Sequence, residues 1–306
     1  MKIEARNHGA GASLLVFIAA ALPAAAQSTA EVAASQPHSR QAPGVSLAAG
    51  SRYQVGGFHR FLWGNNYRRL WAAPIVVPTL ELKRYAGGLR PTGRGGGHQT
   101  ISLHLTAADG RRYSFRSVDK NAIQVLPAEL QLSIVGLIWQ DEVSALFPAA
   151  GLLASPLLRA TGVPTLEPRL FVMPDDPELG EFRPDFSGML GILEEWPTPP
   201  YDGAKEIVGT EDVLRRVTRD PHQRLDTRTF LATRLMDVYL GDADRGQTQW
   251  LWLKRESPSG VMWQPLGIDR DFAFVSYGGV GIYLVRHCYP KPVSYTHLTL
   301  PTNREV

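Results

Sequence analysis

The sequence predicts an α+β fold of two lobes, a strand-rich lobe followed by a helix-rich one. Three observations lead to this prediction. Strand-like segments with a hairpin signal dominate the first half of the folded region, and helical spacing of apolar residues dominates the second. A second hairpin between two acidic loops closes the region. We place the strand-rich lobe at 52–196 and the helical lobe at 197–292.

The composition is that of an ordinary globular protein and excludes several functional classes. The chain has 306 residues, of which 44% are hydrophobic and 20% charged. Its net charge of +3, without a basic block interleaved with aromatics, argues against a nucleic-acid partner. The single cysteine, Cys288, excludes an internal disulfide, and the eight histidines lack the spacing of a zinc site.

Both ends of the chain are set apart from the fold. Residues 1–26 contain two basic residues, a short apolar run and three terminal alanines, which predicts a signal peptide cleaved before Gln27. The protein is therefore expected to be exported to the periplasm or cell envelope of a bacterium. The Ala/Ser/Gln/Pro-rich range 27–51 is expected to be a disordered linker. The segment VSYTHLTLPTNREV (293–306) resembles translated sequencing-adapter DNA and is excluded from the fold. The alternatives are a buried N-terminal helix and a genuine C-terminal tail.

The first half of the folded region contains the strands of the predicted fold. A turn or short helix precedes a strand at 74–82, and a glycine-rich loop follows. TISLHLTA and RYSFRSV then flank ADGR, which is a hairpin signal, and Lys120 comes just after the second strand. A helical region over 127–160 is expected to break at Pro148. RLFVMPDD and GMLGILEEW predict two further strands.

The second half alternates helices with acidic loops. EDVLRRVTRD and LDTRTFLATRLMDVYLGD space their apolar residues at three to four positions, as helices do. TQWLWLKR and VMWQPLGIDRDFAFV predict a β-hairpin around ESPSG, and Trp250 and Trp252 are expected in the core. One acidic loop, GDADRGQTQW, precedes this hairpin, and IDRD follows it.

This order of parts is that of a two-lobed kinase, in which ATP lies between the lobes. Phosphoryl transfer needs a lysine or backbone N–H groups at the phosphates and a carboxylate near the attacking hydroxyl. It also needs Mg²⁺ held by an acid together with an amide or a second acid. The sequence has candidates for each of these parts.

The two acidic motifs, LGDADRGQTQWLW and QPLGIDRDFAF, resemble the catalytic and metal-binding loops of atypical kinases. The nearest types are the persistence-toxin serine kinases of bacteria and the secretory-pathway protein kinases. With NYRRLWAAPIVVPTLEL, GGGHQTISLHL, FRSVDK and LEEWP, the motifs form six pieces over 60–280. In this order the pieces resemble a family of bacterial envelope proteins with a kinase-like region, which can adjoin a metallophosphoesterase region or an outer-membrane barrel. The resemblance implies an atypical kinase-like fold that is truncated at its C-terminus. It also implies association with the outer membrane through the missing C-terminal region.

The resemblance also implies a role for individual residues. Asp244 would be the catalytic aspartate, and Gln249, Asp269 and Asp271 would hold Mg²⁺. The phosphates of ATP or another nucleotide would bind Lys120, with Arg116 as a competing candidate, under a loop of Gly95, Gly96 and Gly97. The hinge to the base would be Glu194 and Glu195, and the carboxylate partner of the lysine would be Asp141 or Glu142. Asp242 would be a helix-end residue, paired with Arg245. The acceptor hydroxyl remains unknown.

Departures from the family pattern keep other functions open. Gly246 stands where the family has histidine, and Ala243 where it has tryptophan. These changes, and the scarcity of ATP outside the cytoplasm, allow a pseudokinase that binds nucleotide without transfer, or a non-catalytic envelope assembly module. A metal-dependent phosphoesterase is disfavoured because no histidine lies within 241–275. The plain alternative for GDADRGQTQW is a solvated turn.

Overall fold

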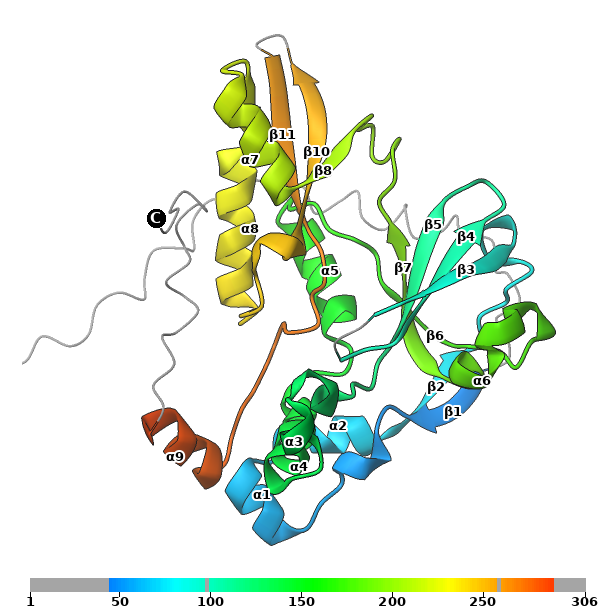
Figure 1. Ribbon diagram of the computed structural model, residues 1–306, viewed down its shortest axis with the longest axis vertical. Coiled ribbons are helices and arrows are strands. Elements are labelled where there is room, and N and C mark those ends of the chain that lie inside the picture. The colour runs from blue at the N-terminus through cyan, green and yellow to red at the C-terminus, as the bar shows by residue number, and fades with distance from the viewer. Residues whose placement is uncertain (1–43, 97–98, 258–259, 289–306) are drawn as a thin grey trace, which may run out of the picture. The chain divides into compact units, whose positions relative to one another are not determined.

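A computed structural model describes residues 44–96, 99–257 and 260–288 and shows a mixed α+β fold (Figure 1). All described residues belong to one unit, Ala42–Val306. The predicted signal peptide and the predicted adapter-derived tail lie outside the described residues.

The regular elements of the described residues alternate between short helices and three sheets. The helices are α1 (Gly57–Trp63), α2 (Arg68–Ala72), α3 (Ala128–Gln131), α4 (Ile134–Asp141), α5 (Ala150–Ala160), α6 (Arg183–Phe186), α7 (Thr210–Arg219), α8 (Thr227–Tyr239) and α9 (Val280–Cys288). The strands are β1 (Gly44–Ala48), β2 (Pro74–Pro78), β3 (Leu89–Gly95), β4 (Ser102–Ala107), β5 (Arg112–Ser117), β6 (Arg169–Val172), β7 (Leu190–Trp196), β8 (Ile207–Gly209), β9 (Gln223–Leu225), β10 (Trp250–Ser257) and β11 (Gly260–Gly267).

The largest sheet is antiparallel, with five strands in the order β3-β4-β5-β7-β6. The predicted hairpin around ADGR is confirmed, because β4 pairs with β5 on either side of that turn. Successive side chains of a strand point to opposite faces of a sheet. One face therefore carries the core residues Leu105, Phe115 and Leu193, which pack with the buried Leu80 and Phe186. The other face is more polar and carries the candidate site.

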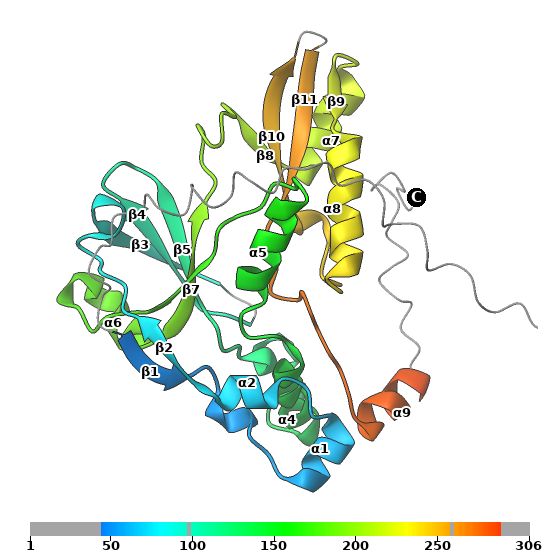
Figure 2. The ribbon, with the colours of Figure 1, turned by 180° about the vertical axis from the view of Figure 1, so that it is seen from behind.

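A second sheet has the strand order β8-β10-β11-β9, and its centre is the predicted hairpin of β10 and β11. The pair of helices α7 and α8 covers one face of this hairpin (Figures 1 and 2). Trp252 and Trp263 pack there against Val213 and Phe230, whereas Leu253 faces a separate core. The prediction that Trp250 and Trp252 are core residues is confirmed, since their exposed fractions are 4% and 2%.

The structure differs from the sequence prediction in several elements. β3 occupies residues that were expected to form only a glycine-rich loop, because pairing with β4 compensates for its Gly and Pro content. β1 lies within the range predicted as a disordered linker and pairs with β2 through its backbone. The linker prediction is therefore wrong for residues 44–48. The predicted helical region breaks near Pro148, but it also divides into α3 and α4. The predicted helical lobe contains a four-stranded sheet as well as helices.

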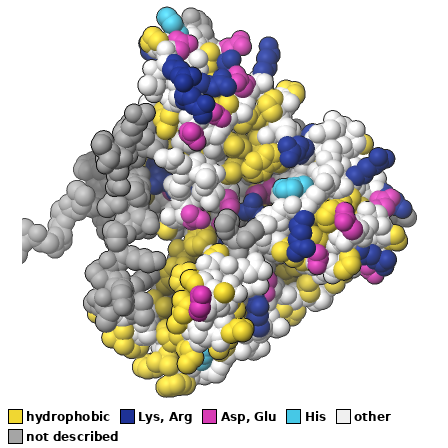
Figure 3. All heavy atoms as spheres, in the orientation of Figure 1, with side chains coloured by type: hydrophobic (Ala, Val, Ile, Leu, Met, Phe, Trp, Pro, Cys, Tyr) yellow, Lys and Arg dark blue, Asp and Glu magenta, His cyan; other side chains and the backbone are white. Residues whose placement is uncertain are grey.

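Exposed apolar side chains gather around α1 and α4, where Figure 3 shows hydrophobic atoms at one end of this face. They include Phe58, Phe61, Leu132, Ile134 and Leu137. No single helix in the described part of the chain is long and apolar enough to cross a membrane. One bent pair of helical segments is long and apolar enough only when its two parts are counted together. These parts are Ile134–Ala145 and Ala150–Ala160, with a bend of 40° between them.

Candidate functional site

The β10–β11 hairpin brings the two acidic loops together, and Arg245 joins them. The Nη1 of Arg245, in the first loop, donates to the Ile268 carbonyl at 2.8 Å, and its Nη2 donates to the Asp269 carbonyl. The Ile268 amide donates to the Gln249 carbonyl at 3.0 Å. The predicted ion pair of Arg245 with Asp242 is confirmed at 3.1 Å between buried side chains. These bonds place the second acidic loop beside the first.

Asp269 is the residue at which the second loop turns. Its φ is +59°, a left-handed conformation that aspartate tolerates better than most residues. The turn directs its carboxylate to the guanidinium of Arg116, on β5, whose Nη1 donates at 2.6 Å. The side chain of Asp269 is 26% exposed, so this ion pair lies at the edge of solvent. A residue predicted to bind phosphate and one predicted to bind metal therefore face each other.

Lys120 makes a second ion pair of the same kind. Its ammonium donates to the carboxylate of Asp271 and lies 4.9 Å from the centre of the Phe272 ring. The Lys120 side chain is 8% exposed. Its backbone carbonyl accepts a hydrogen bond of 2.7 Å from Gln140, on α4, so the lysine is anchored from both ends. The end of β5 is thus joined to the second acidic loop by two cations and two carboxylates.

These ion pairs line a small cavity of about 50 Å³ on the polar face of the five-stranded sheet. Glu194, on β7, points into the same cavity, as does Thr100 from the segment after the glycine-rich turn. Apolar side chains close it on the other sides: Trp71, Val118, Leu146, Phe147, Pro148 and Ile192. Pockets for small molecules usually measure about 300–1,000 Å³. The cavity therefore has to open before it can hold a nucleotide.

Three carboxyl groups around this cavity titrate differently. Burial, and after it the charge of Asp271, raises the pKa of Asp269 above its ordinary value, although Arg116 opposes the shift. Burial would also raise the pKa of Asp271, but the charge and hydrogen bond of Lys120 outweigh it and hold that pKa below its ordinary value. Burial, with help from both aspartates, raises the pKa of Glu194 to about 7 against the effect of Arg116. Burial and mutual repulsion thus make ionising all three carboxyls together costly.

The glycine-rich turn adjoins this cavity. Gly95 ends β3, and Gly96 has a φ of +77°. A Cβ at Gly96 would lie 2.2 Å from the Thr100 carbonyl, so only glycine fits this tight turn. Gly97 lies outside the described residues. Thr100, whose carbonyl lies next to Gly96, lines the same cavity as Asp269.

Other predicted site residues lie elsewhere. Asp244 is exposed, and neither it nor Gln249 belongs to the described lining of this cavity. Gln249 contributes its backbone carbonyl to the loop contact instead. The Glu195 side chain points to the opposite face of the sheet, where it accepts from Arg111 at 3.2 Å, because neighbours on a strand alternate.

The predicted pairing of the lysine with Asp141 is wrong. The Asp141 carboxylate accepts two hydrogen bonds from Arg68, at 2.7 and 2.6 Å, and one of 2.9 Å joins it to His59. The carboxylate that receives the lysine is Asp271. Arg68 comes from 73 positions earlier in the chain, so local sequence could not indicate this pairing.

Sequence reasoning missed a buried ionic cluster behind the second acidic loop. Asp237, near the end of α8, accepts from Arg234 at 2.7 Å and from Arg270 of the loop. Arg270 also lies 3.2 Å from the Asp242 carboxylate. A signal was present in the helical pattern, because Arg234 and Asp237 stand three apart and occupy positions on the inner side of α8.

A scan of the sequence against protein-family models and a search of curated proteins both find no match.

Proposed function

We propose that the protein binds a magnesium–nucleotide complex at the cavity beside the second acidic loop. One observation carries the proposal: the ion pairs Arg116–Asp269 and Lys120–Asp271 set two cations against two acids beside a glycine-constrained turn. Phosphoryl-transfer sites require this combination, with cations for the phosphates and carboxylates for Mg²⁺.

The charges of the two ion pairs suit this ligand. When the pairs separate, Arg116 and Lys120 could bind phosphate oxygens, and Asp269 and Asp271 could bind Mg²⁺. Each charge would then exchange one partner of opposite sign for another, so the site avoids an uncompensated buried charge. No group of three His, Cys, Asp or Glu is placed to hold a metal within the described ranges. Mg²⁺ usually takes only one or two protein carboxylates and completes its shell with phosphates and water.

The chemical step is a phosphoryl transfer to a hydroxyl acceptor, with Asp244 orienting the hydroxyl or accepting its proton. The resemblance to atypical kinases supports this role, and the bond from Arg245 to Asp269 places the two loops side by side. Export to the bacterial envelope and association with the outer membrane complete the proposal. Both rest on the sequence and the resemblance.

A second candidate is a pseudokinase, which binds nucleotide without transfer and serves as an envelope assembly module. Two observations favour it. Asp244 is exposed and stands outside the described lining of the cavity. Gly246 occupies the position of the family histidine, so no imidazole is available there to order the loop.

The first test is stabilisation by nucleotide. Wild-type protein should gain about 2.7 kcal/mol in free energy of unfolding when MgATP or MgGTP is present at about 100 times its dissociation constant. Asp269→Asn should lose this gain, because it removes a metal ligand. The matched control is Asp185→Asn, which breaks an exposed ion pair with Arg94 and should respond as wild type does. Equal responses of Asp269→Asn and wild type, or no response from wild type to either nucleotide, would refute the proposed site.

A second test separates transfer from binding. If the protein is a kinase, Asp244→Asn should lower the release or transfer of labelled γ-phosphate by about 10²- to 10⁴-fold. Its stabilisation by MgATP should remain that of wild type, because Asp244 lies outside the cavity. Wild type that is stabilised by nucleotide but turns over none would establish the pseudokinase instead.

A further inference from the structure

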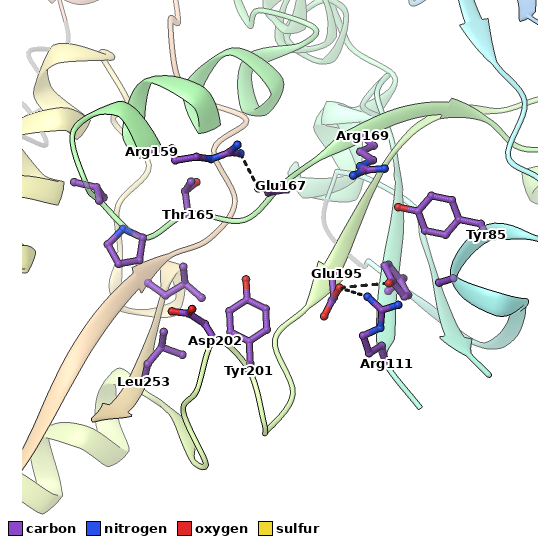
Figure 4. A pocket seen from close by; sticks show the side chains of 15 residues that line it. Tyr85, Arg111, Arg159, Thr165, Glu167, Arg169, Glu195, Tyr201, Asp202 and Leu253 are labelled. Carbon is purple, nitrogen blue, oxygen red and sulfur yellow. Dashed lines mark hydrogen bonds and ion pairs between the residues drawn. The ribbon is translucent and has the colours of Figure 1, made fainter. Parts of the chain in front are cut away.

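A second cavity, larger than the first, lies on the opposite face of the five-stranded sheet from the candidate nucleotide site. It measures about 760 Å³ and is lined from the sheet, the segment after α5 and the β10–β11 hairpin (Figure 4). The strand β7 separates the two cavities, because Glu194 lines the first and Glu195 lines the second. A volume in this range suits a small molecule of ordinary size.

Part of the wall of this second cavity is aromatic and aliphatic. Tyr85 and Tyr113 meet edge to face with ring centres 5.7 Å apart, and Tyr201 points into the cavity from the other side (Figure 4). Leu253 and Leu266, from the hairpin, contribute apolar surface. Burial raises the pKa of Tyr113 and of Tyr201 to about 12 and that of Tyr85 above its ordinary value. The three phenols therefore stay neutral at physiological pH and can donate hydrogen bonds.

Among the described residues, the charged groups that line the cavity leave one cation without an ion-pair partner. The Nη1 of Arg111 lies 3.2 Å from the Glu195 carboxylate, and Arg159 pairs with Glu167 at 2.9 Å. The Asp202 carboxylate forms an ion pair with Arg255. Arg169, at the start of β6, has no carboxylate within 4.0 Å among the residues that the structure describes. It therefore adds to the cavity lining a positive charge that no described carboxylate contacts.

The free guanidinium lies beside a hydroxyl donor. Figure 4 shows Arg169 and the Tyr85 hydroxyl on the same wall, and the charge of Arg169 lowers the pKa of Tyr85 against the larger effect of burial. The planar guanidinium can donate two parallel hydrogen bonds to a carboxylate or phosphate, and the phenol can donate a third. The opposite wall, with the Tyr201 ring and the leucines, is suited to an apolar or planar body.

We propose that this second cavity binds a small anionic molecule, with its carboxylate or phosphate on Arg169 and Tyr85 and an aromatic or apolar body along Tyr201 and the hairpin leucines. The site is separate from the candidate nucleotide site and does not depend on it. The protein would bind a second ligand at this site, against the face of β7 opposite Glu194.

Titration calorimetry with phenylacetate and phenylphosphate tests the proposal and distinguishes a carboxylate from a phosphate ligand. Wild type should bind at least one of the probes saturably, with a dissociation constant below about 10 mM. Arg169→Gln should weaken that binding by about 10- to 100-fold, the range for losing a hydrogen bond to a charged group. Arg169→Lys should recover part of it, because a point charge remains.

The matched control is Arg90→Gln, which removes an exposed arginine from β3 of the same sheet, outside the described lining of this cavity. It should bind as wild type does, and the urea midpoint of each variant checks that the fold is intact. Phenylphosphate bound at Lys120 and Arg116 would survive Arg169→Gln, so equal binding by that variant and wild type overturns the proposal. Failure of both probes to saturate wild type below about 10 mM overturns it as well.

Discussion

Asp237→Asn is expected to lower the free energy of unfolding by about 3–5 kcal/mol, the cost of removing one partner from a buried ion pair. The Asp237 side chain is 1% exposed and accepts hydrogen bonds from both Arg234 and Arg270. The buried cluster has three arginines, including Arg245, and only one other carboxylate, that of Asp242. The neutral amide would leave three guanidinium charges against that single acid.

The asparagine keeps the shape of the side chain, so the expected loss is electrostatic rather than a packing defect. Urea unfolding followed by circular dichroism measures it. The matched control is Asp212→Asn, on α7, whose partner Arg215 is half exposed. That change should cost less than about 1 kcal/mol, because water screens a surface ion pair. A loss for Asp237→Asn no larger than for the control would show that the cluster does not stabilise the fold.

Asp237→Asn should also alter the geometry of the candidate site, because a residue of the buried cluster belongs to the second acidic loop. Arg270 stands between Asp269 and Asp271, and its bond to Asp237 fixes the second acidic loop to α8. Arg245 holds the same loop through two backbone carbonyls. The orientation of both candidate metal ligands thus depends on a buried cluster behind the loop, whose Arg270 also lines the cavity. This arrangement links the stability of the helix end to the geometry of the site.

The sequence predicted those parts of the fold that have a clear local pattern. Alternation and turn chemistry identified the β4–β5 and β10–β11 hairpins, and apolar spacing identified α7 and α8. β3 was missed because its two glycines and one proline conceal its alternation. Its pairing partner, β4, decides its conformation, and a pattern within one segment cannot show that.

The sequence predicted several residues of the candidate site but not which of them form ion pairs with each other. The order of motifs indicated that Arg116 and Lys120 would face the second acidic loop. Which cation meets which acid depends on the left-handed turn at Asp269, which no sequence pattern indicated. Glu194 was predicted to belong to the hinge through its backbone, and the direction of its side chain into the cavity follows from the register of β7 against β5.

Glu194→Gln is expected to stabilise the protein at alkaline pH and to leave its stability nearly unchanged in acid. Burial raises the pKa of Glu194 from an ordinary 4.5 to about 7. Between those values the folded state holds a proton that the unfolded state has released, so wild-type stability falls as pH rises through this window. Glutamine does not titrate, and at about pH 8 the variant should exceed wild type by about 3–3.5 kcal/mol, from roughly 1.4 kcal/mol per pKa unit.

Urea unfolding at about pH 4 and pH 8 measures this difference, which should develop mainly between about pH 4.5 and 7. Glu195→Gln is the matched control, because it removes the next carboxylate of β7, which lies on the opposite face of the sheet. There the Glu195 carboxylate accepts hydrogen bonds from Arg111 and Tyr113. It should not show the same gain with pH. A Glu194→Gln difference that is constant across this range would show that the cavity does not raise the pKa of Glu194. A pH-dependent gain would show instead that the carboxylate is held in a buried place, near Asp269 and Asp271, at a cost in stability, as is common where a site is built for a charged ligand.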